Sequence, residues 1–202
     1  MGFKKIVVLV AVAVFAVGLF ACSGKKVTRV DSDTQIDLSG FWNDTDSRLT
    51  SETMINAVLS SPWIDNFSKA NNRKPVIIIG TVLNRTEEHI DVNTFVRDLQ
   101  VALTNSGKAT FVASSEQREE IRSERDDQAV NARPGTASAQ GNETGADYML
   151  KGTISSIFDS EGGVQVKFYQ IELELINLST NEISWIGQHK IKKVIAKRAF
   201  RS

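Results

Sequence analysis

Few side chains in this 202-residue sequence have the types and spacing that chemistry requires. The single cysteine, Cys22, excludes an intramolecular disulfide and a cysteine-rich metal site. Neither His89 nor His189 has the H-x-x-x-H or H-x-E spacing of a zinc site, so each is expected to be a surface or packing residue. The acidic pairs Glu119-Glu120 and Asp126-Asp127 lie among arginines, which is typical of a solvated helix face. The sequence therefore predicts no catalytic residue, no metal and no cofactor, and the protein is not expected to be an enzyme.

The charge balance argues against a further class of function. Lys+Arg and Asp+Glu number 24 each, so the formal net charge is zero, whereas nucleic-acid-binding domains normally carry a basic excess. No glycine-rich phosphate loop is present, and Gly162-Gly163 is expected to be a hairpin turn. Trp42, Trp63 and Trp185 could form an aromatic binding platform, but packing in the core is the favoured interpretation. We expect neither nucleic acid nor a small-molecule substrate as a partner.

The N-terminal segment is predicted to be a targeting signal rather than part of the fold. Lys4 and Lys5 precede an apolar run from Ile6 to Ala21, whose 16 residues fall short of the roughly 20 that a membrane-spanning helix needs. Leu19-Phe20-Ala21-Cys22 resembles the bacterial lipobox, which implies cleavage before Cys22 and attachment of lipid to that residue. The alternative is an uncleaved membrane anchor with an incidental cysteine. Because Ser23 rather than Asp follows the cysteine, the outer membrane is the expected destination.

These features divide the chain into three predicted parts. Residues 1–21 are the signal peptide, residues 22–37 are the lipidated cysteine with a polar tether, and residues 38–202 are a single α/β domain. Fully extended, the 15 residues from Ser23 to Asp37 reach about 50 Å. The domain is therefore expected to work near its own membrane.

Hydrophobic periodicity and turn residues predict the elements of the domain. The expected helices are one capped by Asp46 or Ser47 and ending near Leu59, a short one from Pro62, one over 91–105 with Gly107 after its end, and one capped by Ser114 or Ser115. The expected strands are 75–83, 110–113, 148–158, 164–178 and 182–194, and 131–145 is expected to be a mobile loop. This order predicts an α+β or mixed α/β sandwich, in which helices pack on a mixed sheet that ends in an antiparallel meander.

Two of these strands carry more specific expectations. The run 76–83 is β-branched and almost continuously apolar, so it should be buried on both faces. In the strand 164–178, Tyr169, Ile171 and Leu173 lie on the more apolar side, which should face the core.

Several motifs together resemble one protein family. They are Asp37-Leu38-Ser39-Gly40-Phe41-Trp42-Asn43-Asp44-Thr45-Asp46-Ser47, Pro62-Trp63-Ile64, Pro75 to Asn84 with Thr86, Asn105-Ser106-Gly107, Gly145-Ala146-Asp147-Tyr148-Met149-Leu150-Lys151-Gly152 and Glu182-Ile183-Ser184-Trp185-Ile186-Gly187. Over roughly Asp37 to Lys193 the sequence resembles the LpoB-type lipoproteins, which activate penicillin-binding proteins. Curli-secretion components and the N-terminal domain of TolB share the general fold of that family, so the resemblance implies a TolB N-terminal domain-like fold.

The resemblance implies an outer-membrane lipoprotein with its domain in the periplasm, which binds and allosterically activates a class A bifunctional penicillin-binding protein in peptidoglycan synthesis. The partner-contacting surface that it implies lies within 118–145, where Arg122, Arg125 and Arg133 are the expected exposed cations. The alternative for each arginine is that it only keeps a surface helix soluble. The alternative for the whole protein is a structural or assembly lipoprotein of an envelope or secretion complex, of the curli-secretion type, with no synthase partner. The short tether departs from the long proline-rich linker of the well-known activator in this family.

Overall fold

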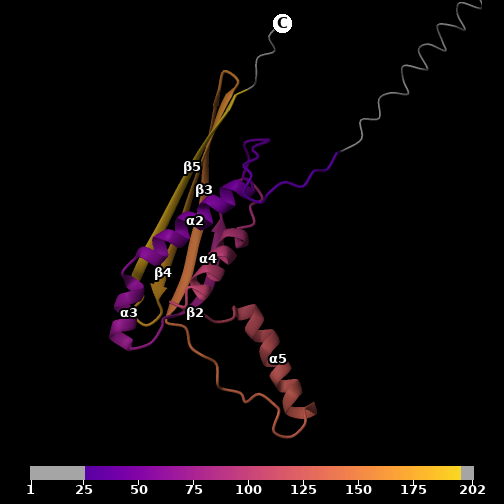
Figure 1. Cartoon of the computed structure of the whole chain (residues 1–202), viewed down its shortest axis with the longest axis vertical. Coiled ribbons are helices and arrows are strands. Elements are labelled where there is room, and N and C mark those ends of the chain that lie inside the picture. The colour runs from indigo at the N-terminus through magenta and orange to yellow at the C-terminus, as the bar shows by residue number, and fades with distance from the viewer. Residues whose placement is uncertain (1–25, 197–202) are drawn as a thin grey trace, which may run out of the picture. The chain divides into compact units, whose positions relative to one another are not determined.

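The computed structural model describes residues 26–196, so Cys22 and the predicted signal peptide lie outside the described residues. Gln35–Ser202 forms one compact unit, and every helix and strand of the described residues belongs to it (Figure 1). None of the helices within 26–196 is both long and apolar enough to cross a membrane.

Four helices and five strands make up the described part of the chain. In chain order they are α2 (Asp44–Ser60), α3 (Trp63–Asn71), β1 (Val76–Asn84), α4 (Asn93–Asn105), β2 (Thr110–Phe111), α5 (Ser115–Asn131), β3 (Tyr148–Glu161), β4 (Val164–Asn177) and β5 (Ile183–Ala196). The strands form one sheet in the order β2-β1-β3-β4-β5. Pairing is parallel from β2 through β1 to β3 and antiparallel from β3 through β4 to β5. The predicted α+β class, with a mixed sheet ending in an antiparallel meander, is confirmed.

Local capping interactions determine where the helices begin. The N-cap of α2 is Asn43, so the predicted cap at Asp46 or Ser47 is wrong. The Asn43 side chain accepts a hydrogen bond from the Asp46 N–H, and the Asp46 carboxylate accepts one from the Asn43 N–H, which moves the start of the helix toward the N-terminus. The predicted cap of α5 at Ser114 is confirmed, and Gln117 completes the same reciprocal arrangement there.

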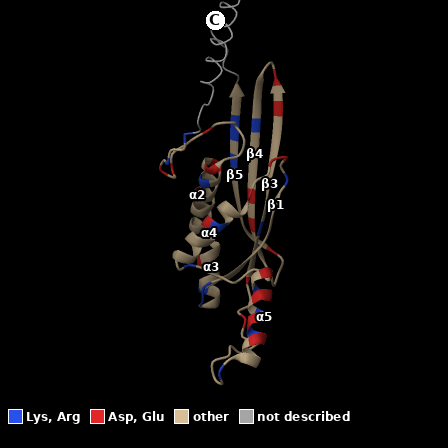
Figure 2. Cartoon of the chain, turned by 90° about the vertical axis from the view of Figure 1, so that its right-hand side faces the viewer, with Lys and Arg blue, Asp and Glu red and all other residues tan. Residues whose placement is uncertain are grey.

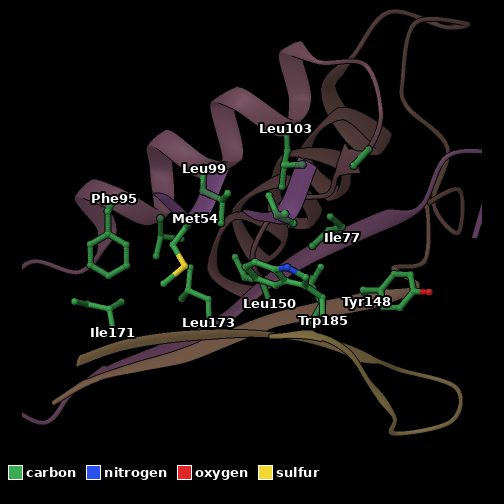
Figure 3. Close-up of a cluster of buried hydrophobic side chains, with 14 of the residues drawn as sticks. Met54, Ile77, Phe95, Leu99, Leu103, Tyr148, Leu150, Ile171, Leu173 and Trp185 are labelled. Atoms are coloured by element: carbon green, nitrogen blue, oxygen red, sulfur yellow. The ribbon is translucent and has the colours of Figure 1, made fainter. Parts of the chain in front are cut away.

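The core lies between one face of the sheet and the helices α2 and α4 (Figure 3). Helix α4 contributes Phe95, Leu99 and Leu103, and α2 contributes Met54 (Figure 3). The sheet contributes alternate residues of β4, so the predicted core-facing side of that strand is confirmed. Those buried β4 residues are Lys167, Tyr169, Ile171, Leu173 and Leu175.

The prediction that β1 is buried on both faces is wrong beyond its first three residues. Val76, Ile77 and Ile78 are buried, but Thr81 is exposed and Leu83 is 43% exposed. The pairing of β1 with β3 shifts in register between Ile79 and Val82, and no helix of the described residues covers the outer face there. The second half of β1 is therefore apolar without being enclosed.

The three tryptophans belong to the core and its margin, as the favoured interpretation predicts. Trp63 and Trp185 are buried. Trp42 is half-buried and packs its ring against the rings of Phe95 and Tyr169, with centroids 6.4 and 5.4 Å apart. These aromatic contacts fix the segment before α2 on the sheet.

Candidate protein-docking surface

Helix α5 and the segment that follows it, residues 115–146, form an arm that extends beyond the end of the sheet (Figures 1 and 2). No residue of α5 is buried. The sequence of α5 explains why the helix covers no core. Its two large aliphatic residues, Ile121 and Val130, do not form a continuous apolar stripe, and both are exposed. A charged helix that covers no core is available to another molecule.

One glutamate ties the returning segment of the arm to α5. Arg122 donates from Nε and Nη2 to Glu143 Oε1 and Oε2, both at 2.8 Å, and Arg125 donates from Nη1 to Oε1 at 3.1 Å. The hydrogen bonds from Arg122 are the main reason why the pKa of Glu143 falls from 4.5 to about 2, and the charge of Arg125 adds to the effect. We call Arg122, Arg125 and Glu143 the arginine clamp.

Two further contacts hold the arm together. Gln140 donates to the Asp126 carboxylate at 2.5 Å, and the Ser138 N–H donates to the Gln128 side chain at 3.1 Å. Between these contacts lies an open hollow of about 480 Å³. Its lining consists of Arg122, Arg125, Asp126, Gln140, Gly141 and Glu143. The segment predicted to be a mobile loop is thus fastened to α5 at several points.

The structure brings two of the three predicted arginines together and leaves the third apart. Arg122 and Arg125 share Glu143, with side chains that are 54% and 22% exposed. Arg133 is exposed in the turn after α5, where its carbonyl accepts hydrogen bonds from the Thr136 N–H and hydroxyl. Within 26–196 no carboxylate lies within 4 Å of the Arg133 guanidinium. Sequence reasoning missed Glu143, although it is the single acidic residue between Gln128 and Ala146.

A second carboxylate, Glu88, lies inside the body of the domain. Its Oε1 accepts hydrogen bonds from Lys167 Nζ at 2.7 Å and the Tyr169 hydroxyl at 2.6 Å, and its Oε2 accepts one from the Trp42 N–H at 2.9 Å. Burial alone would raise the pKa of Glu88, but these donors outweigh it and the pKa is lowered. Burial, with the nearby Glu88, raises the pKa of Tyr169. We call Glu88, Lys167 and Tyr169 the buried network.

The segment 37–43, which we call the strap, is held on the sheet by lysines of β4 and β5. The Lys193 ammonium binds the Asp46 carboxylate, donates to the Phe41 carbonyl at 2.9 Å and lies 3.5 Å from Asp37. Lys167 places its ammonium 3.3 Å from the centroid of the Phe41 ring. The strap therefore joins the body close to the C-terminal end of β5.

Two of the motifs that resemble the LpoB-type lipoproteins position elements of the fold. Asp147 accepts two hydrogen bonds from the Arg73 guanidinium at 2.6 Å each and one from the Val76 N–H at 2.8 Å, which joins the start of β3 to the start of β1. Asn84 accepts hydrogen bonds from the Thr86 N–H and hydroxyl, which closes the turn after β1. These residues have structural roles that account for their types.

Neither histidine occupies a site with ligand-binding character. His89 is exposed, and His189 is half-buried with a pKa lowered by burial. Over residues 26–196, no group of three or more His, Cys, Asp or Glu side chains is placed to hold a metal ion.

A family model described as "Peptidoglycan-synthase activator LpoB" matches residues 46–191. This chain belongs to the LpoB family. The match runs from α2 into β5, so it includes the core, the buried network and the arm. The predicted family is confirmed.

Several solved structures resemble this LpoB-family chain in fold. The LpoB C-terminal domain from Escherichia coli is 20% identical with a TM-score of 0.38, and the similarity covers 70% of this chain and 96% of that one. The LpoB C-terminal domain from Salmonella enterica is 21% identical with a TM-score of 0.35, covering 64% of this chain and 93% of that one. A PelC dodecamer from Paraburkholderia phytofirmans is 13% identical with a TM-score of 0.33, and the similarity covers 62% of this chain and 76% of that one. No curated protein sequence matches the chain.

Proposed function

We propose that this chain is an outer-membrane lipoprotein, anchored through Cys22, whose periplasmic domain binds and allosterically activates a class A penicillin-binding protein. The observation that carries this proposal is the match to the synthase-activator family across nearly the whole folded domain. Members of that family are envelope lipoproteins that act without catalysis. An activator of this kind works by binding the active state of the synthase better than the inactive state, a coupling that is typically about 1–3 kcal/mol.

We infer that the arm is the surface that contacts the synthase. None of its residues is buried, and it carries cations of two kinds. Arg122 and Arg133 are open to solvent and can bind a partner's carboxylates directly. Arg125 is largely covered and holds Glu143, so its role is to position the arm rather than to contact the partner. A surface that is already in its binding conformation loses less entropy on association.

The shape of the domain helps to explain how a short tether can serve this function. The strap enters the body beside Lys193, three residues before the end of β5. The arm lies at the opposite end of the sheet, because it connects β2 with the first residue of β3. Lys193 is in register with Lys167 and Phe158, and ten residues of β3 separate Phe158 from Tyr148, so the sheet places the arm about 33 Å from the strap. The folded domain thereby adds to the reach of the predicted tether.

A polymerisation assay tests the proposal. The fragment Cys22–Ser202 with Cys22→Ala, which keeps every residue of the described core, is added to the class A synthase of the same organism. We expect faster glycan polymerisation, and we expect Arg122→Ala with Arg133→Ala to reduce the stimulation. The matched control replaces Arg48 and Arg97, which lie on α2 and α4. Absence of binding at micromolar concentration would contradict the proposal, and ring-shaped oligomers in light scattering would favour the structural alternative.

A further inference from the structure

The end of the chain is strongly basic although the chain as a whole is neutral. Residues 190–202, Lys-Ile-Lys-Lys-Val-Ile-Ala-Lys-Arg-Ala-Phe-Arg-Ser, contain six of the 24 Lys and Arg residues and no Asp or Glu. This segment includes the last part of β5 and the residues that follow it. Within 26–196 this segment holds Lys190, Lys192 and Lys193, and the proposed synthase contact uses none of these three.

The described lysines of this segment divide between the two faces of the sheet. Lys193 points toward the strap and is bound to Asp46. Lys190 and Lys192 are exposed on the outer face, in register with Gln170 and Phe168 of β4. Within 26–196 neither of these two ammonium groups has a carboxylate within 4 Å. Two cations are thus presented side by side without a partner of opposite charge.

Aliphatic side chains accompany these lysines on the same face. Ile157 and Val194 are each 66% exposed, and Val164 is 43% exposed. The register places Ile157, Phe168 and Lys192 in one row and Asp159, Val166 and Val194 in the next. We call the outer-face residues Ile157, Val164, Lys190, Lys192 and Val194 the basic tip.

Carboxylates of β4 and β3 lie on the same face as the basic tip. Glu172 of β4 pairs with Gln188, one row from Lys190, and accepts hydrogen bonds from the Gln170 and Gln188 side chains. Asp159 and Glu161 belong to β3, which is separated from β5 by β4. Neighbouring strands are about 4.8 Å apart, so two strand spacings separate these carboxylates from the lysines. Strand β5 itself contains no acidic residue, and its sequence continues into Lys197, Arg198 and Arg201.

The basic tip is at the end of the domain that the predicted tether joins. Lys193, which holds the strap through Phe41 and Asp37, is next to Lys192 in the sequence. Cys22 precedes Gln35, the first residue of the compact unit, by 13 residues, which span about 45 Å at most. A lipid anchor at Cys22 would keep this end of the domain close to a membrane.

We propose that the basic tip docks on an anionic phospholipid bilayer, the surface of the leaflet that holds the anchor. Cations beside exposed aliphatic side chains are the combination that binds the interface of such a bilayer, because the cations bind phosphates while the aliphatic groups leave water. A two-fold contact between copies would instead bring the lysines of both copies together. Docking of the tip directs the arm away from the anchoring membrane, toward the side where the proposed synthase lies. The inference uses the proposed anchor only to select the membrane.

Vesicle binding by the unlipidated fragment tests this contact separately from the anchor and from the synthase. Cys22–Ser202 with Cys22→Ala is mixed with phosphatidylcholine vesicles that contain either none or one third phosphatidylglycerol, and bound protein is measured by sedimentation. We expect binding to the anionic vesicles that weakens as salt is raised. Lys190→Gln with Lys192→Gln should weaken it about 25-fold, roughly fivefold for each charge. Lys74→Gln with Lys108→Gln, two exposed lysines at the other end of the sheet, should change it less than twofold.

Further variants distinguish docking on a bilayer from general charge attraction and from pairing between copies of the chain. Val194→Ser should also weaken binding, because it removes aliphatic area while keeping every charge. The proposal would be overturned if replacing Lys74 and Lys108 weakened vesicle binding as much as replacing Lys190 and Lys192. It would also be overturned if the unmodified fragment did not bind anionic vesicles at low salt. Oligomers that appear when Lys190 and Lys192 are replaced would also overturn it, because the lysines would then serve to keep the β5 edge from pairing. Stimulation of the synthase in solution should not change in the Lys190→Gln, Lys192→Gln protein.

Discussion

Glu88 in the body and Glu143 on the arm are both carboxylates that accept three hydrogen bonds, yet their surroundings differ. The Glu88 and Lys167 side chains are only 14% and 11% exposed, and the Trp42 backbone supplies one of the donors. Glu143 is bound by two arginines of a helix that has no buried residue. A carboxylate with three hydrogen-bond donors therefore occurs once among core residues, at Glu88, and once at the solvent-exposed surface, at Glu143.

The difference in burial separates stability from positioning. An ion pair in the low-dielectric interior cannot lose one member without leaving a desolvated charge, so the buried network is tied to the folding of the body. Water can solvate either partner of the arginine clamp, so the clamp contributes little to global stability and instead fixes the conformation of the arm. The body provides a stable scaffold, and the clamp holds the arm in one conformation while adding little to the stability of that scaffold.

The largest effect is expected from breaking the buried network. Glu88→Ala leaves the Lys167 ammonium and the Tyr169 hydroxyl without their acceptor, so the free energy of unfolding should fall by about 3 kcal/mol. Urea denaturation followed by circular dichroism measures this change. Glu87→Ala is the matched control, because Glu87 is exposed and is the adjacent residue. A loss below about 1 kcal/mol for Glu88→Ala would remove the contrast between the two carboxylates.

An intermediate effect is expected at Asp147, where the arm returns to the body. Asp147→Ala removes the acceptor of the Arg73 guanidinium and of the Val76 N–H, so the free energy of unfolding should fall by about 2 kcal/mol. The same denaturation experiment on Asp98→Ala, an exposed aspartate of α4, gives the baseline. A change in Asp147→Ala no larger than that baseline would show that this contact does not hold β3 to β1.

A small effect on stability, with a clear effect on dynamics, is expected at the clamp. Glu143→Gln removes the charge that both arginines bind, so amide hydrogen exchange should accelerate within residues 132–146. The thermal midpoint of the whole domain should not change measurably, because α5 covers none of the core. A cooperative loss of global stability would mean that the arm and the body form one folding unit.

The pH dependence of the clamp gives the finest test of the comparison. Because the pKa of Glu143 is about 2 in the folded arm and 4.5 otherwise, the stabilisation from the clamp is fully present above about pH 4.5 and is lost as the pH falls toward 2. Carboxyl-carbon NMR should find Glu143 titrating near pH 2. In Arg122→Ala the pKa of Glu143 should rise toward 4.5, since Arg122 provides the main hydrogen bonds. An unchanged titration in that variant would exclude the clamp in solution.

Periodic patterns allowed most of the body to be predicted from the sequence. The alternation in β4 identified its buried face, and the cap at Ser114 identified the start of α5, because both depend on residues that are close in the chain. The open second half of β1 could not be predicted, since an apolar run does not reveal which of its faces a helix covers. The clamp was missed for a related reason, because Glu143 is 18 residues from Arg125 and no periodicity links them.

The central claim is that the arm is the surface by which this LpoB-family protein binds a class A synthase. Its most direct test is the affinity of the purified synthase ectodomain for the Cys22–Ser202 fragment and its variants, measured by calorimetry. We predict that Arg122→Ala with Arg133→Ala weakens binding at least tenfold, because charge-assisted contacts at an interface are lost. Arg48→Ala with Arg97→Ala, which leaves the arm intact, should leave the affinity unchanged. The claim would be contradicted if the unmodified fragment and both double variants bound the synthase with equal affinity. It would also be contradicted if the unmodified fragment did not bind.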